Sequence, residues 1–365
     1  MTRISLAKSF ALLAIVSLGL SSTALAQGSV SSKISGEITA LHMQMKLESD
    51  PAAIVGLRED IFKLFIAKKS SSYRKNAFKA IYKQFGPMIE NQPKAFSAND
   101  EFAANKRLNI VMAICKMRTS AAIGVLQKLA GDNDPAIRAQ AWIGLHRNIY
   151  YIFKASKTKR EAFMKMLANA MKTEKAPGVL RQIFRFADLG SNNTYTKKIS
   201  SGQRKTAATA FFKMLQNNWK AYRLILRAKG DATSAAAMSE AVKTQASLAK
   251  YLGSTPTIAK ASLQMSLDMG ASATIVMGEI WADWETEAKN PLVVASLKQL
   301  ILDCEASLQT VSGIRFSPAA TAVKKSAVNM TAAPDNIYTS LTNWLDKLAK
   351  FKVTEPEELE LPKAK

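Results

Sequence analysis

An arginine recurs at a nearly constant interval in the middle of this chain, each time within the same local pattern. The pattern is an apolar helical run, a short polar turn, and a second run that carries the arginine. The three copies hold Arg138, Arg181 and Arg223. A two-helix unit of this size cannot bury its apolar face alone, so a chain made of such units must stack them.

The clearest copy lies at residues 126–145. It has an acidic turn, with Asp134 placed to cap the second helix and Pro135 in its first turn, where proline is tolerated. The second copy joins residues 163–171 to 177–181, and the third joins 208–215 to 222–224 across a polar break at 216–218. Weaker echoes occur at residues 50–54, 255–260 and 290–293.

A unit of about 42 residues with Asp-x-x-x-[Ile/Val]-Arg at its turn resembles the HEAT repeat. The resemblance is confined to residues 105–230, and it implies a HEAT-like α-solenoid that presents a concave surface to a partner. The basic linkers at residues 150–160 and 191–205 are longer than usual for this family, which predicts protruding loops. The alternative is a non-repetitive helical protein with one chance Asp-Pro-x-x-Arg helix start.

Strong helix formers dominate the chain after Ser35, and strand-like alternation is missing, so the sequence predicts an all-α fold. The C-terminal part is rich in Ala, Ser and Met and is predicted to be helical but less regular. The predicted organisation is a signal peptide (1–26), an N-terminal helical region (27–104), basic HEAT-like repeats (105–230), a helical C-terminal region (231–353) and an acidic disordered tail (354–365).

The beginning of the chain, up to Ala26, has the order of a secretory signal peptide. Arg3 and Lys8 precede an apolar run at residues 10–20, and Thr23-Ala24-Leu25-Ala26 follows as a small-residue cleavage site. We therefore expect an exported bacterial protein, periplasmic or secreted; the alternative is a short anchor that is never cleaved. No later apolar run is long enough to span a bilayer, so no transmembrane segment is expected in the rest of the chain.

The positive charge of the chain is concentrated in one segment. Without the signal peptide, 49 Lys and Arg stand against 28 Asp and Glu. Residues 136–230 hold 20 of those basic residues and only 3 acidic ones, a net charge of +17. A field of this size attracts anionic partners, although a solvated face that only keeps the protein soluble would look the same.

Two basic clusters and two repeat arginines are therefore the candidate binding residues. Arg181 and Arg223 are included because little acid stands in their turns, whereas Asp132 and Asp134 can pair with Arg138. Neighbouring aromatic residues could stack on a ligand, but their spacing also fits a helical core. The candidates are Lys154, Lys157, Lys159, Arg160, Arg181, Lys197, Lys198, Arg204, Lys205 and Arg223.

These features favour a non-catalytic scaffold that binds an acidic protein or an anionic envelope polymer. A nucleic-acid-associated role is the alternative, although export separates the protein from the chromosome. The sequence does not indicate the oligomeric state.

The sequence lacks recognisable catalytic or metal-binding motifs. It has two histidines, His42 and His146, neither with a second metal ligand nearby, so no metal site and no cofactor are expected. The enzyme alternative is a carbohydrate-active protein that uses Asp283 and Glu287, which fall on one helical face. Any acidic pair at this spacing would match, so a solvated helix face is the competing interpretation.

The two cysteines test the stacked fold. Cys115 and Cys304 both stand in apolar helical runs, which favours buried thiols over a disulfide. Several units of the repeat would separate them along the chain. Stacked helices 8–10 Å apart would therefore place them about 40 Å from each other.

Overall fold

The computed structural model describes residues 32–97, 99–190, 199–282, 291–316 and 333–356. All regular secondary structure in these residues is helical, which confirms the predicted all-α class. The α-helices are α2 (Ser32–Leu47), α3 (Pro51–Ile66), α4 (Ser71–Ile89), α5 (Ala103–Lys116), α6 (Ile123–Leu129), α7 (Pro135–Arg147), α8 (Ile149–Lys154), α9 (Lys157–Thr173), α10 (Pro177–Ala187), α11 (Ser201–Lys229), α12 (Ala232–Tyr251), α13 (Pro256–Ala282), α15 (Pro291–Ser312) and α17 (Ala333–Leu348). Short 3₁₀ helices are η1 (Ser120–Ala122) and η4 (Ala349–Phe351).

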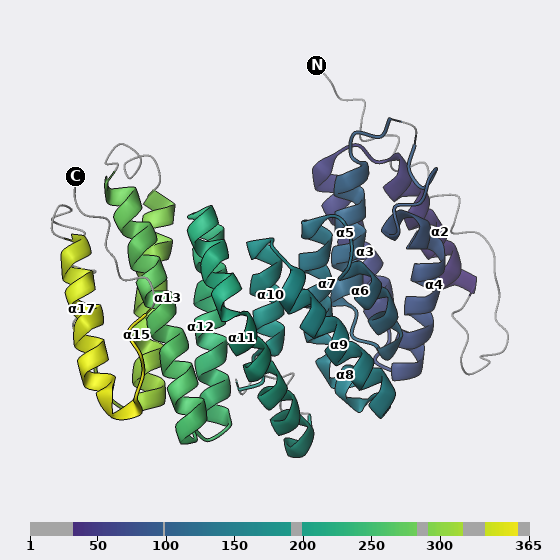
Figure 1. Ribbon diagram of the computed structural model, residues 1–365. Helices are drawn as coiled ribbons and strands as arrows, with labels where there is room; N and C mark the ends of the chain where they lie inside the picture. Colours follow the sequence, from purple (N-terminus) through teal and green to yellow (C-terminus); the bar gives the residue numbers. More distant parts are fainter. Residues whose placement is uncertain (1–31, 98, 191–198, 283–290, 317–332, 357–365) are drawn as a thin grey trace.

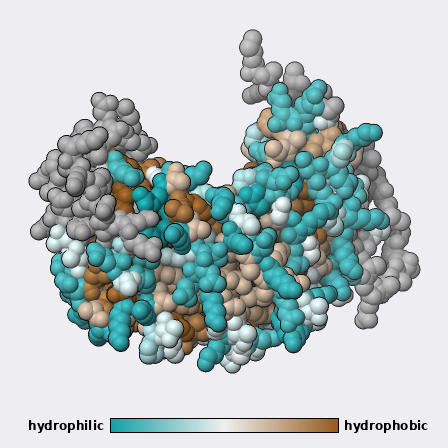
Figure 2. Space-filling model, in the orientation of Figure 1, coloured by the Kyte–Doolittle hydropathy of each residue, from teal (hydrophilic) through white to brown (hydrophobic). Residues whose placement is uncertain are grey.

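The helices stand side by side in a curved row that follows chain order from α2 to α17 (Figure 1). In one series, each member packs on the next: α3, α5, α7, α10, α12 and α15. A parallel series runs through α9, α11, α13 and α17. The surface over the middle of the row lies lower than the surface at its N-terminal end (Figure 2).

Proline marks the first turn of several helices, as the sequence predicts. Asp134 caps α7, because its carboxylate accepts a hydrogen bond of 2.8 Å from the backbone N–H of Ala136. Asp50 caps α3 in the same way, and Pro51 and Pro135 each occupy the first helical turn. The helix pairs α6–α7 and α9–α10 therefore fall where the first two copies of the sequence unit predict them.

Aromatic side chains join successive helices in the core. The ring of Trp142 on α7 lies 6.3 Å from that of Phe163 on α9 and 5.7 Å from that of Phe186 on α10. Phe186 in turn lies 6.2 Å from Phe211 on α11, measured between ring centroids. All four side chains are buried, so these contacts hold four helices to one another.

The predicted third unit is wrong, because α11 runs without interruption from Ser201 to Lys229. The expected break at residues 216–218 lies in the middle of this helix, where the Asn218 side chain donates to the carbonyl of Met214. Phe211, Leu215 and Trp219 stand four residues apart and are buried on one face. Burying that face outweighs the weak helix propensity of asparagine, which costs at most about 0.7 kcal/mol per residue.

The predicted basic loop at residues 150–160 is also wrong. Helix α8 ends at Lys154 and α9 begins at Lys157, so only Ala155 and Ser156 separate them. Residues 149, 152 and 153 anchor α8 in the core, and this burial keeps the segment helical. The second predicted loop, at residues 191–205, lies mostly outside the described residues; its described end enters α11.

A buried polar network joins α12, α13 and α15 in the C-terminal part. The amide of Gln245 donates to the hydroxyls of Ser266 at 2.7 Å and Ser307 at 2.8 Å, and its carbonyl accepts from Ser262. All four side chains are buried. Because each hydroxyl or amide has a partner inside the protein, the network keeps these helices together without exposing polar atoms to an apolar surrounding.

Cys115 and Cys304 are buried, unpaired thiols, as expected. They belong to α5 and α15, which lie toward opposite ends of the row (Figure 1). Burial raises the pKa of the Cys115 thiol to about 12. Among the described helices, none combines the length and the apolar character needed to cross a bilayer.

Candidate functional site

Several sequence-predicted residues lie outside the described residues. They include Lys197 and Lys198 of the second basic cluster and the acidic pair Asp283 and Glu287. The signal peptide (1–26) and most of the acidic tail (354–365) lie outside as well. The remaining candidates are on α8, α9, α10 and α11.

The repeat arginines have acidic partners inside the protein, contrary to the expectation for two of them. Arg138 forms two hydrogen bonds, of 2.8 and 2.9 Å, to the carboxylate of Glu174 on the next unit. Arg181 lies 3.8 Å from Glu240, and the buried Arg223 lies 3.8 Å from Asp268. The partners come from later segments of the chain and not from the local turn, which is why the turn sequences did not reveal them.

The ion pair between Arg138 and Glu174 is largely shielded from water, since their side chains are only 19% and 9% exposed. Burial alone raises the pKa of Glu174, but hydrogen bonds from Arg138 and from the backbone N–H of Ala176 lower it overall. This pair therefore acts as a brace between α7 and the start of α10 and is not available to a ligand.

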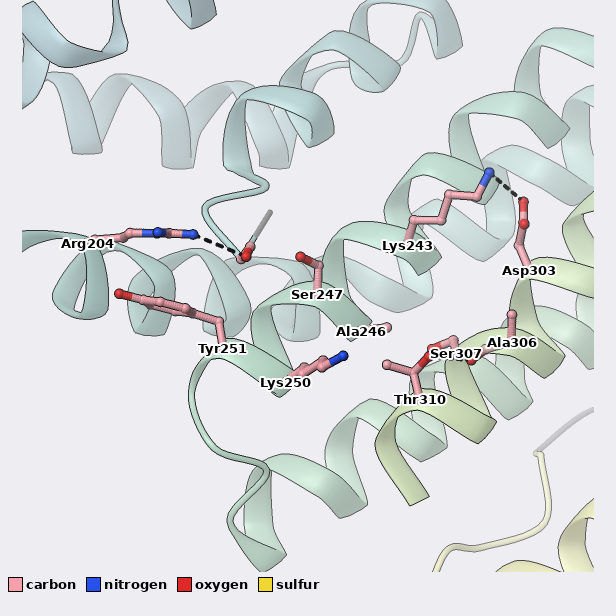
Figure 3. Close-up of a pocket in the computed structure, with 11 residues that line it drawn as sticks. Arg204, Lys243, Ala246, Ser247, Lys250, Tyr251, Asp303, Ala306, Ser307 and Thr310 are labelled. Carbon is pink, nitrogen blue, oxygen red and sulfur yellow. Dashed lines mark hydrogen bonds and ion pairs between the residues drawn. The ribbon is translucent and has the colours of Figure 1, made fainter. Parts of the chain in front are cut away.

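Arg204 is engaged in a pocket of about 680 Å³ between α11, α12 and α15 (Figure 3). Its guanidinium donates to the carbonyls of Leu189 and Gly190 and stacks 4.4 Å from the ring centroid of Tyr251. Across the same pocket, Lys243 forms a 2.9 Å ion pair with Asp303. Most of the positive charge in this pocket is therefore used in internal contacts.

A larger hollow of about 1150 Å³ lies between α11, α13 and the segment after α17. Its lining mixes lysines, among them Lys220 and Lys260, with the acids Asp268 and Glu355. The backbone N–H of Thr354 donates to Gln264 at 2.8 Å and ties the C-terminal segment across the hollow. Opposite charges share this surface, so it does not present a uniform field to an anion.

The exposed lysines near α9 belong to a different arrangement, which we call the lysine groove. It consists of two adjoining hollows of about 720 and 610 Å³ that share Ser120, Gly124 and Lys159. Helix α4 forms one wall, η1 and α6 form the floor, and α8 and α9 form the other wall; Figure 1 shows α6 between these walls.

Five lysines line the groove, and its lining contains no carboxylate. Lys75, Lys79 and Lys83 extend from α4, and Lys154 and Lys159 extend from α8 and α9. All five are exposed, and no ion pair with any of them occurs in the described residues. Same-sign charge along both walls concentrates anions in the groove, since no acid in the lining cancels its field.

The floor of the groove is apolar and open. It carries the half-buried Ile123 and Val125, while Ile152 and Phe163 on the α8–α9 side are buried beneath it. Gly124 leaves bare backbone on the floor, and a Cβ placed there would have no atom within 4 Å. The groove thus combines charged walls with a floor that can accept apolar groups.

Sequence reasoning found only one wall of this groove. Lys154 and Lys159 belong to the predicted first cluster, whereas its other members lie elsewhere: Lys157 faces Glu161 at 3.9 Å, and Arg160 donates to the carbonyl of Ala155. Lys205 is exposed on α11 and does not line the groove. The α4 lysines were missed because residues 27–135 have a modest net charge, although their regular spacing of four residues on one helix was a usable signal.

Neither histidine shows the surroundings of a metal site. Burial lowers the pKa of His42 and His146, so each favours its neutral form. Lys46 lowers the pKa of His42 further, whereas Asp188 partly offsets the effect of burial on His146. In the part of the chain that the structure describes, no three His, Cys, Asp or Glu side chains come together in a way that could hold a metal ion.

A comparison of the whole chain with models of protein families and with curated proteins finds no match. The fold and the groove describe an all-helical protein with a lysine-walled groove on its surface.

Proposed function

We propose that this protein is an exported, non-catalytic scaffold with a HEAT-like α-solenoid that binds an acidic protein or an anionic envelope polymer. The observation that carries the proposal is the lysine groove, in which five lysines without ion pairs in the described residues share a lining that has no carboxylate. Long-range attraction brings an anionic chain to such a surface, and contacts along the groove then retain it.

The solenoid part of the proposal rests on how the helices follow one another. The pairs α6–α7 and α9–α10 recur along the row, and the Arg138–Glu174 brace links one pair to the next. A stack of such pairs exposes extended surfaces to partners. It also keeps Cys115 and Cys304 far apart, so a disulfide between them, detected by mass spectrometry without reduction, would contradict this arrangement.

The binding proposal is tested with the triple variant Lys75→Glu, Lys79→Glu and Lys83→Glu. We expect at least a tenfold loss of affinity for polyglutamate at 50 mM salt, with the melting temperature nearly unchanged, because the three side chains are exposed. Affinity of the unaltered protein should fall steeply between 50 and 300 mM salt, since screening shortens the reach of the field.

The matched control is Lys165→Glu, Lys172→Glu and Lys213→Glu. These exposed lysines lie in the strongly basic segment 136–230 but outside the groove lining, and the control changes net charge by the same amount. We expect its affinity to fall less than threefold. Equal losses in the two triple variants would show that net charge alone retains the polymer and that the groove is not the binding site.

Nucleic acid remains the alternative ligand. Tyr151 lines the groove near Lys154, and an aromatic ring beside cations can stack on a base. Single-stranded DNA binding at least tenfold tighter than polyglutamate, with most of the difference lost in Tyr151→Leu, would favour this alternative.

A further inference from the structure

The lysine groove has a charge spacing that narrows the choice of partner. Lys75, Lys79 and Lys83 stand four residues apart on α4, and their side chains line the same hollow. A helix rises 1.5 Å per residue, so successive lysines are displaced by about 6 Å along the wall, and the set of three spans about 12 Å.

An extended peptide offers a matching repeat. Its residues rise about 3.3 Å each, so every second side chain projects to the same side at intervals of about 6.6 Å. Acidic residues on alternate positions would therefore meet the three α4 lysines one to one, over about five residues of peptide. A contiguous block of acids would direct half of its carboxylates away from this wall.

The side of the groove opposite α4 is complementary to apolar side chains of a bound peptide. Ile123 on the floor and Tyr151 on α8 are half-buried and present apolar surface, and their partners in the groove would be the residues between the acids. Burying those side chains adds affinity that does not depend on salt. Lys154 and Lys159 on this side then meet acids at the ends of the segment or the peptide carboxylate.

We propose that the lysine groove accepts an extended peptide segment in which acidic and apolar residues alternate over about five positions. This inference rests on the proposed function, because it names which acidic partner the groove takes. It makes a protein segment the ligand, in preference to an anionic glycan, whose rings carry no alternating apolar side chains.

The test compares two fluorescent peptides of identical composition against the full chain. In Gly-Glu-Leu-Glu-Leu-Glu-Gly the acids alternate with leucine, and in Gly-Glu-Glu-Glu-Leu-Leu-Gly they form a block. By fluorescence anisotropy we expect the alternating peptide to bind at least fivefold tighter, and we expect Lys79→Gln to remove most of that preference. Polygalacturonate should displace the bound alternating peptide no better than polyglutamate does.

A second variant blocks the groove without changing its charge, and so tests whether the peptide binds inside it. Gly124→Trp should fill the floor without disturbing the fold, since a side chain there points into open space, and Gly124→Ala is the matched control. We expect the tryptophan variant to lose at least fivefold in affinity for the alternating peptide and the alanine variant to retain it. Thermal melting of both variants confirms that the fold is intact.

Equal affinities of the two peptides, or unchanged peptide binding in Gly124→Trp, would overturn this inference. Tighter binding of polygalacturonate than of either peptide would overturn it too. None of these results affects the proposed function, which fails only if the α4 lysine triple variant holds polyglutamate as well as the unaltered protein does.

Discussion

The lysine groove and the α10–α15 part of the molecule use positive charge in opposite ways. In the groove, five lysines are exposed and lack ion pairs in the described residues. Between α10 and α15 the cations meet acids of neighbouring helices: Arg181 and Arg185 approach Glu240, and Lys243 pairs with Asp303. Positive residues therefore hold helices together in one region and remain available to a ligand in the other.

The difference shows that charge density along a sequence does not locate a binding surface. Residues 136–230 carry most of the net charge, yet the arginines we singled out there bond to carboxylates, backbone carbonyls or a serine hydroxyl. A planar guanidinium with several donors suits such fixed internal contacts, whereas a lysine ammonium remains well hydrated at the surface. Whether a positive side chain is available to a ligand depends more on the kind of cation and its partners than on the number of cations nearby.

Among the substitutions that test this comparison, Arg138→Met is expected to change the free energy of unfolding the most. Removing the guanidinium leaves the carboxylate of Glu174 shielded from water without its main partner, so we expect unfolding to become easier by about 3 kcal/mol. Urea denaturation measures the change. Lys157→Met is the control, because its 3.9 Å ion pair with Glu161 is exposed and its loss should stay within about 0.5 kcal/mol.

Gln245→Leu should have the next largest effect. The substitution removes the group that bonds to Ser262, Ser266 and Ser307 in a buried network, which should cost about 2 kcal/mol in unfolding free energy. Polyglutamate binding by the folded variant should be unchanged. Gln216→Leu on exposed α11 surface is the control, and a comparable loss there would mean that the network contributes little.

The acid sensitivity of the protein should trace in part to Glu90, close to the lysine groove. Hydrogen bonds from Tyr82 and Lys128 lower the pKa of Glu90 to about 2 from an ordinary 4.5. A depressed pKa in the folded state stabilises it above pH 4.5, and this contribution is lost as the pH falls from about 4.5 toward 2. Glu90→Gln should therefore show a shallower loss of melting temperature across this window, whereas Glu161→Gln should keep the original profile.

Neutralising the α4 lysines should change the free energy of unfolding the least, and should raise it instead of lowering it. Lys75, Lys79 and Lys83 are like charges four residues apart, and each such pair costs roughly 0.2–0.5 kcal/mol. Replacing all three with glutamine should raise the unfolding free energy by up to about 1 kcal/mol, measured in urea. A clear loss of stability would mean that these lysines have a structural role, as the arginines do.

The sequence predicted much of the helical pattern but only half of the groove. Capping and proline signals gave the starts of α3 and α7 correctly, because these signals act within a few residues. The break expected inside α11 failed since the continuous buried face of that helix, including Leu215 and Trp219, overrides local asparagine preferences. Lys154 and Lys159 were found as a cluster, but their counterparts on α4 stand far away in the sequence.

By itself, the sequence determined that this protein is all-helical and strongly basic, because helix propensity, apolar periodicity and net charge are local or additive properties. Only the tertiary structure decided which charges are paired. Glu174, Glu240 and Asp268 are 36 or more residues from the arginines they contact, and no local sequence pattern predicts these ion pairs. Packing α4 against η1, which also contacts α6, placed lysines from two separate segments on the two walls of one groove.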